Sequence, residues 1–328
     1  MSVPAMREIR RLFPEAHIAL QTRPWAKDIF ADSALFDEII ELGSLDSKIT
    51  GPLRQAEALR PHKFDLGVLF PNSFASAFIA RLGNVRKRVG YATDGRSFLL
   101  TDPIAVPKWK SQRHEVYYYL NLVGELEKDL FDWQTVAMTA PAVDIPVSER
   151  RRSEARELLS QHGVDRSRPI VALAPGSTNS RAKRWHAESF AALSDRLQNE
   201  HGTSVILIGA ADEAEISDCV LALSTMRPVD LTGKTTLSQA GAILSEIDLL
   251  VCNDMGLAHL APAVGTKTLV IFGPTDHVTT RPFSPLAEIA RAGVECSPCM
   301  LRDCPIDHRC MTRVAVSQVF DKARTMLI

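Results

Sequence analysis

Residues 249–261 place chemically useful side chains directly after an apolar run. The run ends at Asn253 and Asp254, and Gly256 opens a segment rich in alanine and leucine. This order predicts a buried strand, a tight turn and a helix start, the corner at which open parallel sheets bind phosphates. Gly256 would let a ligand approach the backbone, and Asp254 suits helix capping or hydrogen bonds from sugar hydroxyls. The alternative is an Asp that only caps, with His259 merely packed one turn later.

Further apolar runs in the second half end in Gly-rich segments with little side-chain bulk, so backbone could reach a ligand there. These segments are Pro175-Gly176-Ser177, Gly209–Glu213 and Phe272–Asp276. Lys183 and Arg184 follow the first of them, where a cation could neutralise charge on a departing diphosphate; singly, each is equally a surface cation. There is no G-x-G-x-x-G after a strand and no G-x-x-x-x-G-K-[ST]. Neither a nicotinamide dehydrogenase nor a P-loop NTPase is therefore supported.

A cysteine cluster near the C-terminus has the tightest metal-like spacing in the chain. Cys296 and Cys299 form a C-x2-C pair, which Cys304 and Cys310 follow closely. Four thiolates could surround one structural zinc, with His308 as a substitute ligand. The alternative is four free thiols. A catalytic zinc is not expected, because the ligand-binding residues lie at the strand ends.

Basic residues gather in the first half around Val89-Gly90-Tyr91, which reads as a short strand and loop. They are Arg81, Arg86, Lys87, Arg88 and Arg96. From their charge alone, these residues are expected to form a solvent-exposed surface. The alternative is a binding site for an anionic acceptor.

Composition excludes several classes of protein. The 38 Lys and Arg nearly balance the 39 Asp and Glu, so no global field favours nucleic acid. No run approaches the roughly 20 apolar residues of a membrane span, and the first residues lack the apolar core of a signal peptide. We therefore expect a cytoplasmic protein, in which six cysteines argue against a disulfide framework.

The elements that must position these residues alternate between strands and helices. We expect strands at 17–22, 38–42, 65–70 and 89–91, and helices at 2–13, 25–31, 51–59, 74–82, 117–123 and 148–162. In the second half we expect strands at 169–174, 203–209, 229–232, 248–253 and 268–272, and helices at 187–200 and 238–247. At 328 residues the chain favours two α/β domains, 1–165 and 166–328, each with a doubly wound parallel sheet.

The first half opens on a helix, whereas a sheet of this kind normally begins with a strand that becomes central. We therefore expect a strand upstream of Met1.

The motifs together resemble the ADP-heptose:lipopolysaccharide heptosyltransferases of glycosyltransferase family 9, most closely the heptosyltransferase II branch. The resemblance covers almost the whole chain and is carried by Ala174-Pro175-Gly176, Ala182–Trp185, Asn253–His259, Phe272–Thr275, Pro71–Phe74 and Arg88–Tyr91. It implies a GT-B architecture, two Rossmann-like domains facing a cleft. The nucleotide-sugar would bind the C-terminal domain and the lipid-linked acceptor the N-terminal one.

The resemblance also implies roles for single residues. Lys183 would face the donor diphosphate as the catalytic cation, and Glu213 is the candidate for the ribose hydroxyls. The expected donor-binding set is Gly176, Ser177, Asn179, Lys183, Glu213, Asp254, Met255, Gly256 and His259. The expected acceptor-binding set is Asn72, Ser73, Arg88 and Arg96. Met255 departs from the family, which usually has Ser or Thr there, and the family's general-base Asp would lie in the strand expected upstream of Met1.

The expected reaction moves heptose from ADP-L-glycero-D-manno-heptose to the inner-core heptose of lipopolysaccharide, with inversion and without a required cofactor. The partners would be the donor, a lipid A–inner-core acceptor and the inner membrane surface, contacted transiently from the cytoplasm. Two alternatives stay open: another GT-B enzyme such as a nucleotide-sugar epimerase, and a non-catalytic sugar-nucleotide-binding relative.

Overall fold

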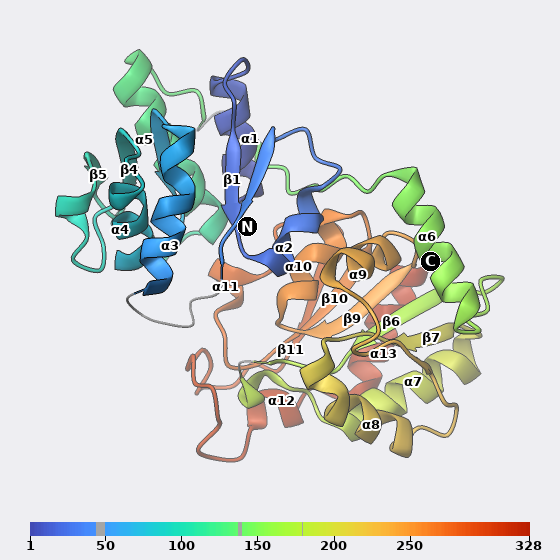
Figure 1. Ribbon diagram of the computed structural model, residues 1–328. Coiled ribbons are helices and arrows are strands. Elements are labelled where there is room, and N and C mark those ends of the chain that lie inside the picture. Colours follow the sequence, from blue (N-terminus) through green and yellow to red (C-terminus); the bar gives the residue numbers. More distant parts are fainter. Residues whose placement is uncertain (44–49, 137–139, 179) are drawn as a thin grey trace. The chain divides into compact units, whose positions relative to one another are not determined.

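The computed structural model describes residues 1–43, 50–136, 140–178 and 180–328 (Figure 1). Its chain divides into two compact units. Unit 1 comprises Met1–Lys27 and Ser33–Ala142, and unit 2 comprises Asp28–Asp32 and Val143–Ile328. Each unit has parallel strands and a hydrophobic core of its own.

Unit 1 alternates strands and helices, as the sequence predicts. Its elements are α1 (Val3–Leu12), β1 (Ala19–Thr22), α2 (Pro24–Lys27), β2 (Glu38–Glu41), α3 (Thr50–Leu59), η2 (Arg60–His62), β3 (Leu66–Leu69), α4 (Phe74–Leu82), β4 (Lys87–Tyr91), η3 (Ser97–Leu99), β5 (Asp102–Ile104) and α5 (Glu115–Phe131). The strands form two parallel sheets, β1–β2 and β3–β4–β5, instead of the single expected one. In the larger sheet β4 is central, between β3 and β5.

Helix α5 covers the larger sheet of unit 1 through stacked tyrosines. The rings of Tyr91 and Tyr118 lie 4.1 Å apart, and the Tyr91 hydroxyl donates to the Tyr118 carbonyl at 2.7 Å. Both side chains are buried, and burial raises the pKa of the Tyr91 hydroxyl. This packing fixes the end of β4, which precedes the loop that carries Arg96.

Unit 2 contains a six-stranded parallel sheet with the order β11-β10-β9-β6-β7-β8. Its elements are η1 (Asp28–Phe30), α6 (Glu149–Gln161), β6 (Ile170–Ala174), η5 (Arg181–Lys183), α7 (Ala187–His201), β7 (Ser204–Leu207), η6 (Ala211–Glu213), α8 (Ala214–Leu223), β8 (Val229–Asp230), α9 (Leu237–Leu244), β9 (Leu249–Asn253), α10 (Gly256–Ala263), β10 (Lys267–Phe272), α11 (His277–Thr280), β11 (Ala287–Arg291), α12 (Arg309–Thr312) and α13 (Val316–Leu327). The first strand, β6, is central, and the strand order reverses between β6 and β9. This is the doubly wound order of dinucleotide-binding sheets.

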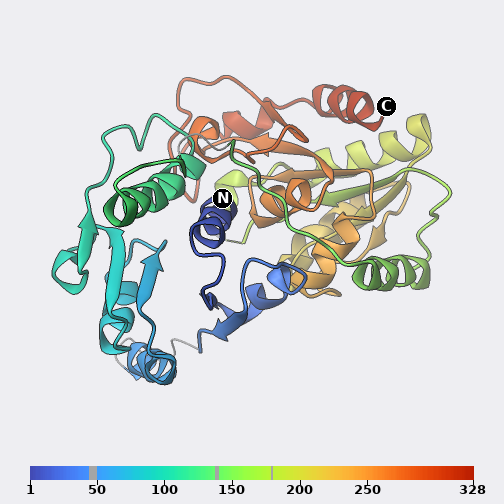
Figure 2. The same ribbon diagram turned by 90° about the horizontal axis from the view of Figure 1, so that it is seen from above.

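Both faces of this sheet are buried, which explains the nearly continuous apolar runs of its strands. Residues of β6 and β9 alternate between two cores: Val171 and Leu173 face one, and Ala172 and Ala174 face the other. Figure 2 shows yellow-green α7 and red α13 on one side of the sheet, and green α6 and orange α9 on the other. The expected Rossmann-like fold is confirmed for this unit.

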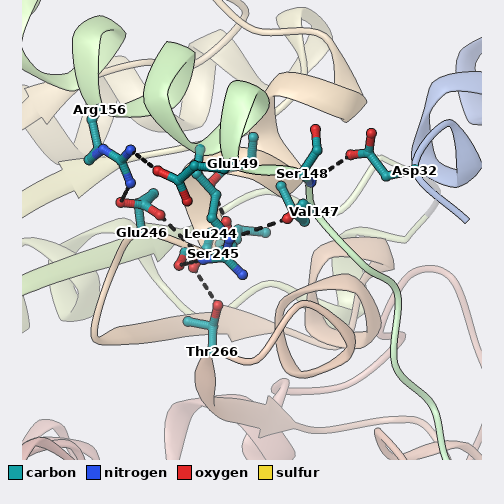
Figure 3. A network of polar contacts seen from close by, with 11 residues as sticks. Asp32, Val147, Ser148, Glu149, Arg156, Leu244, Ser245, Glu246 and Thr266 are labelled. Atoms are coloured by element: carbon teal, nitrogen blue, oxygen red, sulfur yellow. Dashed lines mark hydrogen bonds and ion pairs between the residues drawn. The ribbon is translucent and has the colours of Figure 1, made fainter.

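Helix α6 belongs to unit 2 because arginines tie it to the end of α9 (Figure 3). Arg152 donates to the Ser245 carbonyl at 2.8 Å, and Arg156 pairs with Glu246 at 3.1 Å. At the start of the helix, the Ser148 N–H donates to Asp32 at 2.8 Å. The division between the units therefore falls between Ala142 and Val143, earlier than the boundary expected near residue 165.

In the part of the chain that the structure describes, no helix combines the length and the apolar character that crossing a membrane requires.

Candidate active site

The strand ends β6 and β9 meet at the point where the strand order reverses, and the side chain of Asn253 joins them. Its amide Nδ2 donates to the carbonyls of Pro175 and Gly176 at 2.8 and 3.1 Å, and its Oδ1 accepts the Trp185 N–H at 2.9 Å. Asn253 is fully buried. One amide thus fixes both ends of the loop that carries Lys183, at the edge where doubly wound sheets bind their ligands.

Lys183 and Asp254 form an ion pair at this edge. The Lys183 ammonium lies 2.8 Å from Asp254 Oδ2 and 3.4 Å from the Asp254 carbonyl, and Thr275 donates to the same carboxylate oxygen at 2.7 Å. The Asp254 side chain is 8% exposed and that of Lys183 is 27% exposed. The carboxylate is therefore engaged by a cation and a hydroxyl, instead of capping α10, while the ammonium keeps access to solvent.

Helix α10 begins directly after Asp254, and its first turn lies beside the ion pair. Met255 is its N-cap residue with an extended backbone, and in the described residues its side chain makes no capping hydrogen bond. A Cβ added at Gly256 would meet no described atom within 4 Å, so the helix N-terminus is open to a ligand. His259 is half-buried one turn later. The N–H groups of a helix N-terminus and the positive end of the helix dipole favour an anion here.

Glu213 lies at the same edge of the sheet, in η6, which follows β7. It is 2% exposed, accepts the Ala210 N–H at 3.0 Å and accepts the Thr178 hydroxyl at 3.3 Å. Burial raises the pKa of its carboxyl. A Cβ on Gly176 would lie 2.1 Å from Glu213 Cδ, so only glycine fits against this side chain.

Two further expected donor residues flank the loop after β6. Ser177 is buried, and its carbonyl accepts from Arg184 Nε and Nη2 at 3.3 and 3.2 Å. Arg184 thus stabilises the loop from within. Asn179 lies outside the described residues.

In unit 1, Asn72 and Ser73 lie where β3 leads into α4. Asn72 Oδ1 accepts the Tyr118 hydroxyl at 3.2 Å, and the Asn72 carbonyl accepts from Thr93 at 2.9 Å. Ser73 caps α4 by accepting the Ser76 N–H at 3.3 Å. The structure brings these residues together at the carboxyl end of β3.

The two arginines expected to bind the acceptor donate their hydrogen bonds mainly to backbone carbonyls. Arg96 is fully buried and donates from Nε to the Tyr91 carbonyl at 3.0 Å and from Nη1 to Pro71 and Ser73. Its Nη2 finds no hydrogen-bond partner in the described residues, and burial lowers the pKa of the guanidinium. Arg88 donates to the Leu99 carbonyl at 2.8 Å and to other carbonyls nearby. Arg96 therefore links the segments that follow β3 and β4, whereas Arg88 links the residues before β4 to η3.

Over residues 53–309 the chain matches the family described as glycosyltransferase family 9 (heptosyltransferase). The chain belongs to glycosyltransferase family 9. It is 29% identical over 301 residues to lipopolysaccharide heptosyltransferase 2 of Salmonella typhimurium, covering 89% of this chain and 84% of that protein. It is 26% identical to lipooligosaccharide heptosyltransferase 2 of Campylobacter jejuni, covering 100% of this chain and 94% of that protein.

Solved structures of this family share the fold. The structure of E. coli ADP-heptose lps heptosyltransferase II matches with a TM-score of 0.83 and 23% identity, over 99% of this chain and 94% of that one. A family 9 glycosyl transferase of Veillonella parvula matches with a TM-score of 0.85 and 20% identity, over 99% and 92%. The expected GT-B fold and the expected glycosyltransferase family are thereby confirmed.

The four cysteines of the C-terminal cluster form no disulfide in this glycosyltransferase. Cys310 is buried in the core, and its pKa is raised to about 11 by burial and then by the neighbouring thiols of Cys296, Cys304 and Cys299. Among the described residues, no three His, Cys, Asp or Glu side chains are arranged to hold a metal ion.

Two residues of this network have no role predicted from the sequence. Asn253 and Thr275 appear there only within the motifs that carry the family resemblance. The signal for Asn253 was available, because an amide at the last position of a buried strand must find buried partners. Thr275 reaches Asp254 from the segment that follows β10, and no periodicity in the sequence places that segment.

Proposed function

We propose that this family 9 glycosyltransferase moves a heptosyl group from ADP-L-glycero-D-manno-heptose to the inner-core heptose of a lipid-linked lipopolysaccharide precursor. The observation that carries the proposal is the Lys183–Asp254 pair beside the open N-terminus of α10, at the edge where the strand order of unit 2 reverses. The names of the relatives supply the donor and the acceptor class.

In this proposal the donor diphosphate lies at the first turn of α10. The Gly256 N–H and its neighbours donate to phosphate oxygens, which the missing Cβ of Gly256 leaves accessible. Lys183 supplies the cation, and Asp254 orients it, because the carboxylate holds the ammonium at 2.8 Å and is itself held by Thr275. Asp254 thus acts through Lys183 and need not touch the phosphates, which would repel it.

The reaction proposed for this site is a single displacement at the anomeric carbon of the donor. The acceptor hydroxyl oxygen forms a bond to the anomeric carbon while the bond from that carbon to the diphosphate oxygen breaks, and the hydroxyl proton passes to a base. ADP leaves with the bonding electron pair, so negative charge grows on the oxygen that departs. Lys183 and the N–H groups of α10 stabilise this charge in an edge that is largely buried.

The nucleoside is assigned to the β6 and β7 ends. The Gly-rich segments Pro175–Ser177 and Gly209–Ala211 leave room for the sugar and base, and Glu213 would accept hydrogen bonds from ribose hydroxyls. That role requires the carboxyl to exchange its Thr178 contact for the ribose.

The acceptor is assigned to unit 1, which we propose to contact the cytoplasmic face of the inner membrane transiently. Phe98 is 75% exposed and Phe74 is 39% exposed, with ring centroids 6.1 Å apart. Exposed neighbouring aromatic side chains favour the interfacial region of a bilayer. Sedimentation with vesicles of phosphatidylethanolamine and phosphatidylglycerol tests this point, since Phe98→Ser should lower the bound fraction.

Donor profiling tests the proposed reaction. The chain should release ADP from ADP-heptose when an inner-core acceptor is present, and should leave UDP-N-acetylglucosamine unchanged. Epimerisation of a nucleotide-sugar, or transfer from another donor at a higher rate, would replace the proposal with another GT-B activity. Tight ADP-heptose binding without any transfer would support the non-catalytic alternative instead.

A further inference from the structure

The segment Ser297–His308, called here the 297–308 loop, contacts both loops that hold the Lys183–Asp254–Thr275 network. It follows β11 and leads into α12, and in Figure 1 it passes beside the segment after β6. Its contacts go mainly to backbone atoms. They therefore set where the chain runs on either side of the ion pair.

The first set of contacts fixes the backbone next to Lys183. The Ala182 N–H donates to the Arg302 carbonyl at 2.9 Å, and Ser180 Oγ donates to the same carbonyl at 3.2 Å. His308 Nε2 lies 2.6 Å from the Ala182 carbonyl, so this ring nitrogen carries the proton and donates it. Ala182 is 2% exposed. Both polar groups of the residue that precedes Lys183 are thus satisfied by the 297–308 loop.

The second set fixes the backbone next to Thr275. The N–H groups of Cys299 and Met300 both donate to the Pro274 carbonyl, at 3.0 and 2.8 Å. Ser297 Oγ donates to the Gly273 carbonyl at 2.6 Å. Thr275, the next residue, donates to Asp254. One loop therefore holds the chain on both sides of the carboxylate.

We propose that His308 is a positioning residue for the donor site, which holds Lys183 in place through the Ala182 carbonyl. The inference deepens the proposed function and rests on it. His308 has a left-handed backbone with φ 55°, and its ring lies against the Ala182 carbonyl. A displacement of a catalytic group by about 1 Å is enough to lower turnover strongly, so this single hydrogen bond supports the alignment of Lys183 with the diphosphate.

Three substitutions separate the hydrogen bond from the backbone. His308→Asn keeps a residue that tolerates the left-handed region but has too short a side chain to replace Nε2, and His308→Ala loses both properties. His308→Gln carries an amide nitrogen at about the reach of Nε2. The Asn and Ala variants should lower kcat with ADP-heptose by about fivefold or more, with KM changed less, and Gln should restore most of the loss.

Arg181→Ala is the matched control, because it breaks another link between the same two segments. Its ion pair with Asp303, at 2.7 Å, lies on the surface, where both side chains are largely exposed. An exposed ion pair of this kind contributes little to stability. Arg181→Ala should therefore keep wild-type kinetics.

A double-mutant cycle with Lys183→Ala decides whether His308 acts through Lys183. In the Lys183→Ala background, His308→Asn should change kcat by less than about twofold, because the group that it positions is gone. An undiminished loss in that background, or wild-type kinetics for both His308→Asn and His308→Ala, would overturn the proposal. If Lys183→Ala itself leaves kcat unchanged, the proposed donor role of Lys183 fails instead.

Discussion

Lys183→Ala tests the proposed donor site most directly. At 2.8 Å, the gross Coulomb attraction between Lys183 and Asp254 is about 6 kcal/mol at an effective dielectric constant of about 20. Desolvation offsets most of this, and the 27% exposure of the Lys183 side chain screens the rest. The substitution leaves a nearly buried carboxylate with one hydroxyl donor, so we expect a loss of about 2 kcal/mol in the free energy of unfolding.

The loss of stability does not by itself lower turnover, because the variant should stay folded. Any fall in kcat therefore reports the missing cation. Without the cation, turnover of ADP-heptose should fall tenfold or more, which corresponds to about 1.4 kcal/mol or above of transition-state stabilisation. Steady-state ADP release against donor concentration measures kcat and KM, and urea denaturation measures stability. Asp254→Ala should give a similar loss of turnover, because Lys183 then lacks its orienting partner.

The double variant Lys183→Ala, Asp254→Ala separates stability from chemistry. Removing both charges should recover part of the lost stability, since no unpaired buried charge remains. It should not recover turnover. Kinetics near those of the unmodified chain in either single variant, with ADP-heptose as donor, would refute the assignment.

Other predictions concern the walls of the site and the cysteine cluster. Gly176→Ala should cost about 1–3 kcal/mol in unfolding free energy by pushing Glu213 aside, whereas Gly293→Ala, whose Cβ meets no described atom within 4 Å, should be neutral. Because the pKa of Glu213 is raised by burial, its contribution to stability is full below 4.5 and is lost as pH rises through the folded-state pKa. Urea denaturation at pH 5 and pH 7 should therefore show a smaller decline for Glu213→Gln than for the unmodified chain. Iodoacetamide at pH 8 should label exposed Cys299 well before Cys310, whose pKa is about 11, and uniform protection of the cluster with one equivalent of zinc would contradict the free-thiol arrangement.

The sequence predicts the position of the donor site because that position follows from general rules. An apolar run that ends at Asn253 and Asp254 before a Gly must be a strand end, and parallel strands bring their carboxyl ends to one edge. The pairing of Lys183 with Asp254 is not predictable in the same way. It depends on how the loop after β6 folds back, and Asn253 decides that through contacts distant in sequence.

The roles of the arginines show the same limit. A cluster of basic residues around β4 indicates charge near a strand end, but it does not reveal that Arg96 is fully buried and donates to the carbonyls of Tyr91 and Pro71. The boundary expected near residue 165 assigns helix α6 to the first domain. Its arginines contact Ser245 and Glu246, almost a hundred residues later, and no local pattern reports such a contact.

The amide of Asn253 has a consequence for engineering. It anchors Pro175, Gly176 and Trp185 at once, so the loop that leads from β6 to α7 begins and ends at one fixed point. Closing a loop whose ends are already held costs little more when a few residues are added. Insertions into this loop that keep Ser180 and Ala182, whose contacts hold Lys183, should thus leave the sheet unchanged. Libraries of such insertions should alter which nucleotide-sugars the enzyme accepts and still yield folded protein.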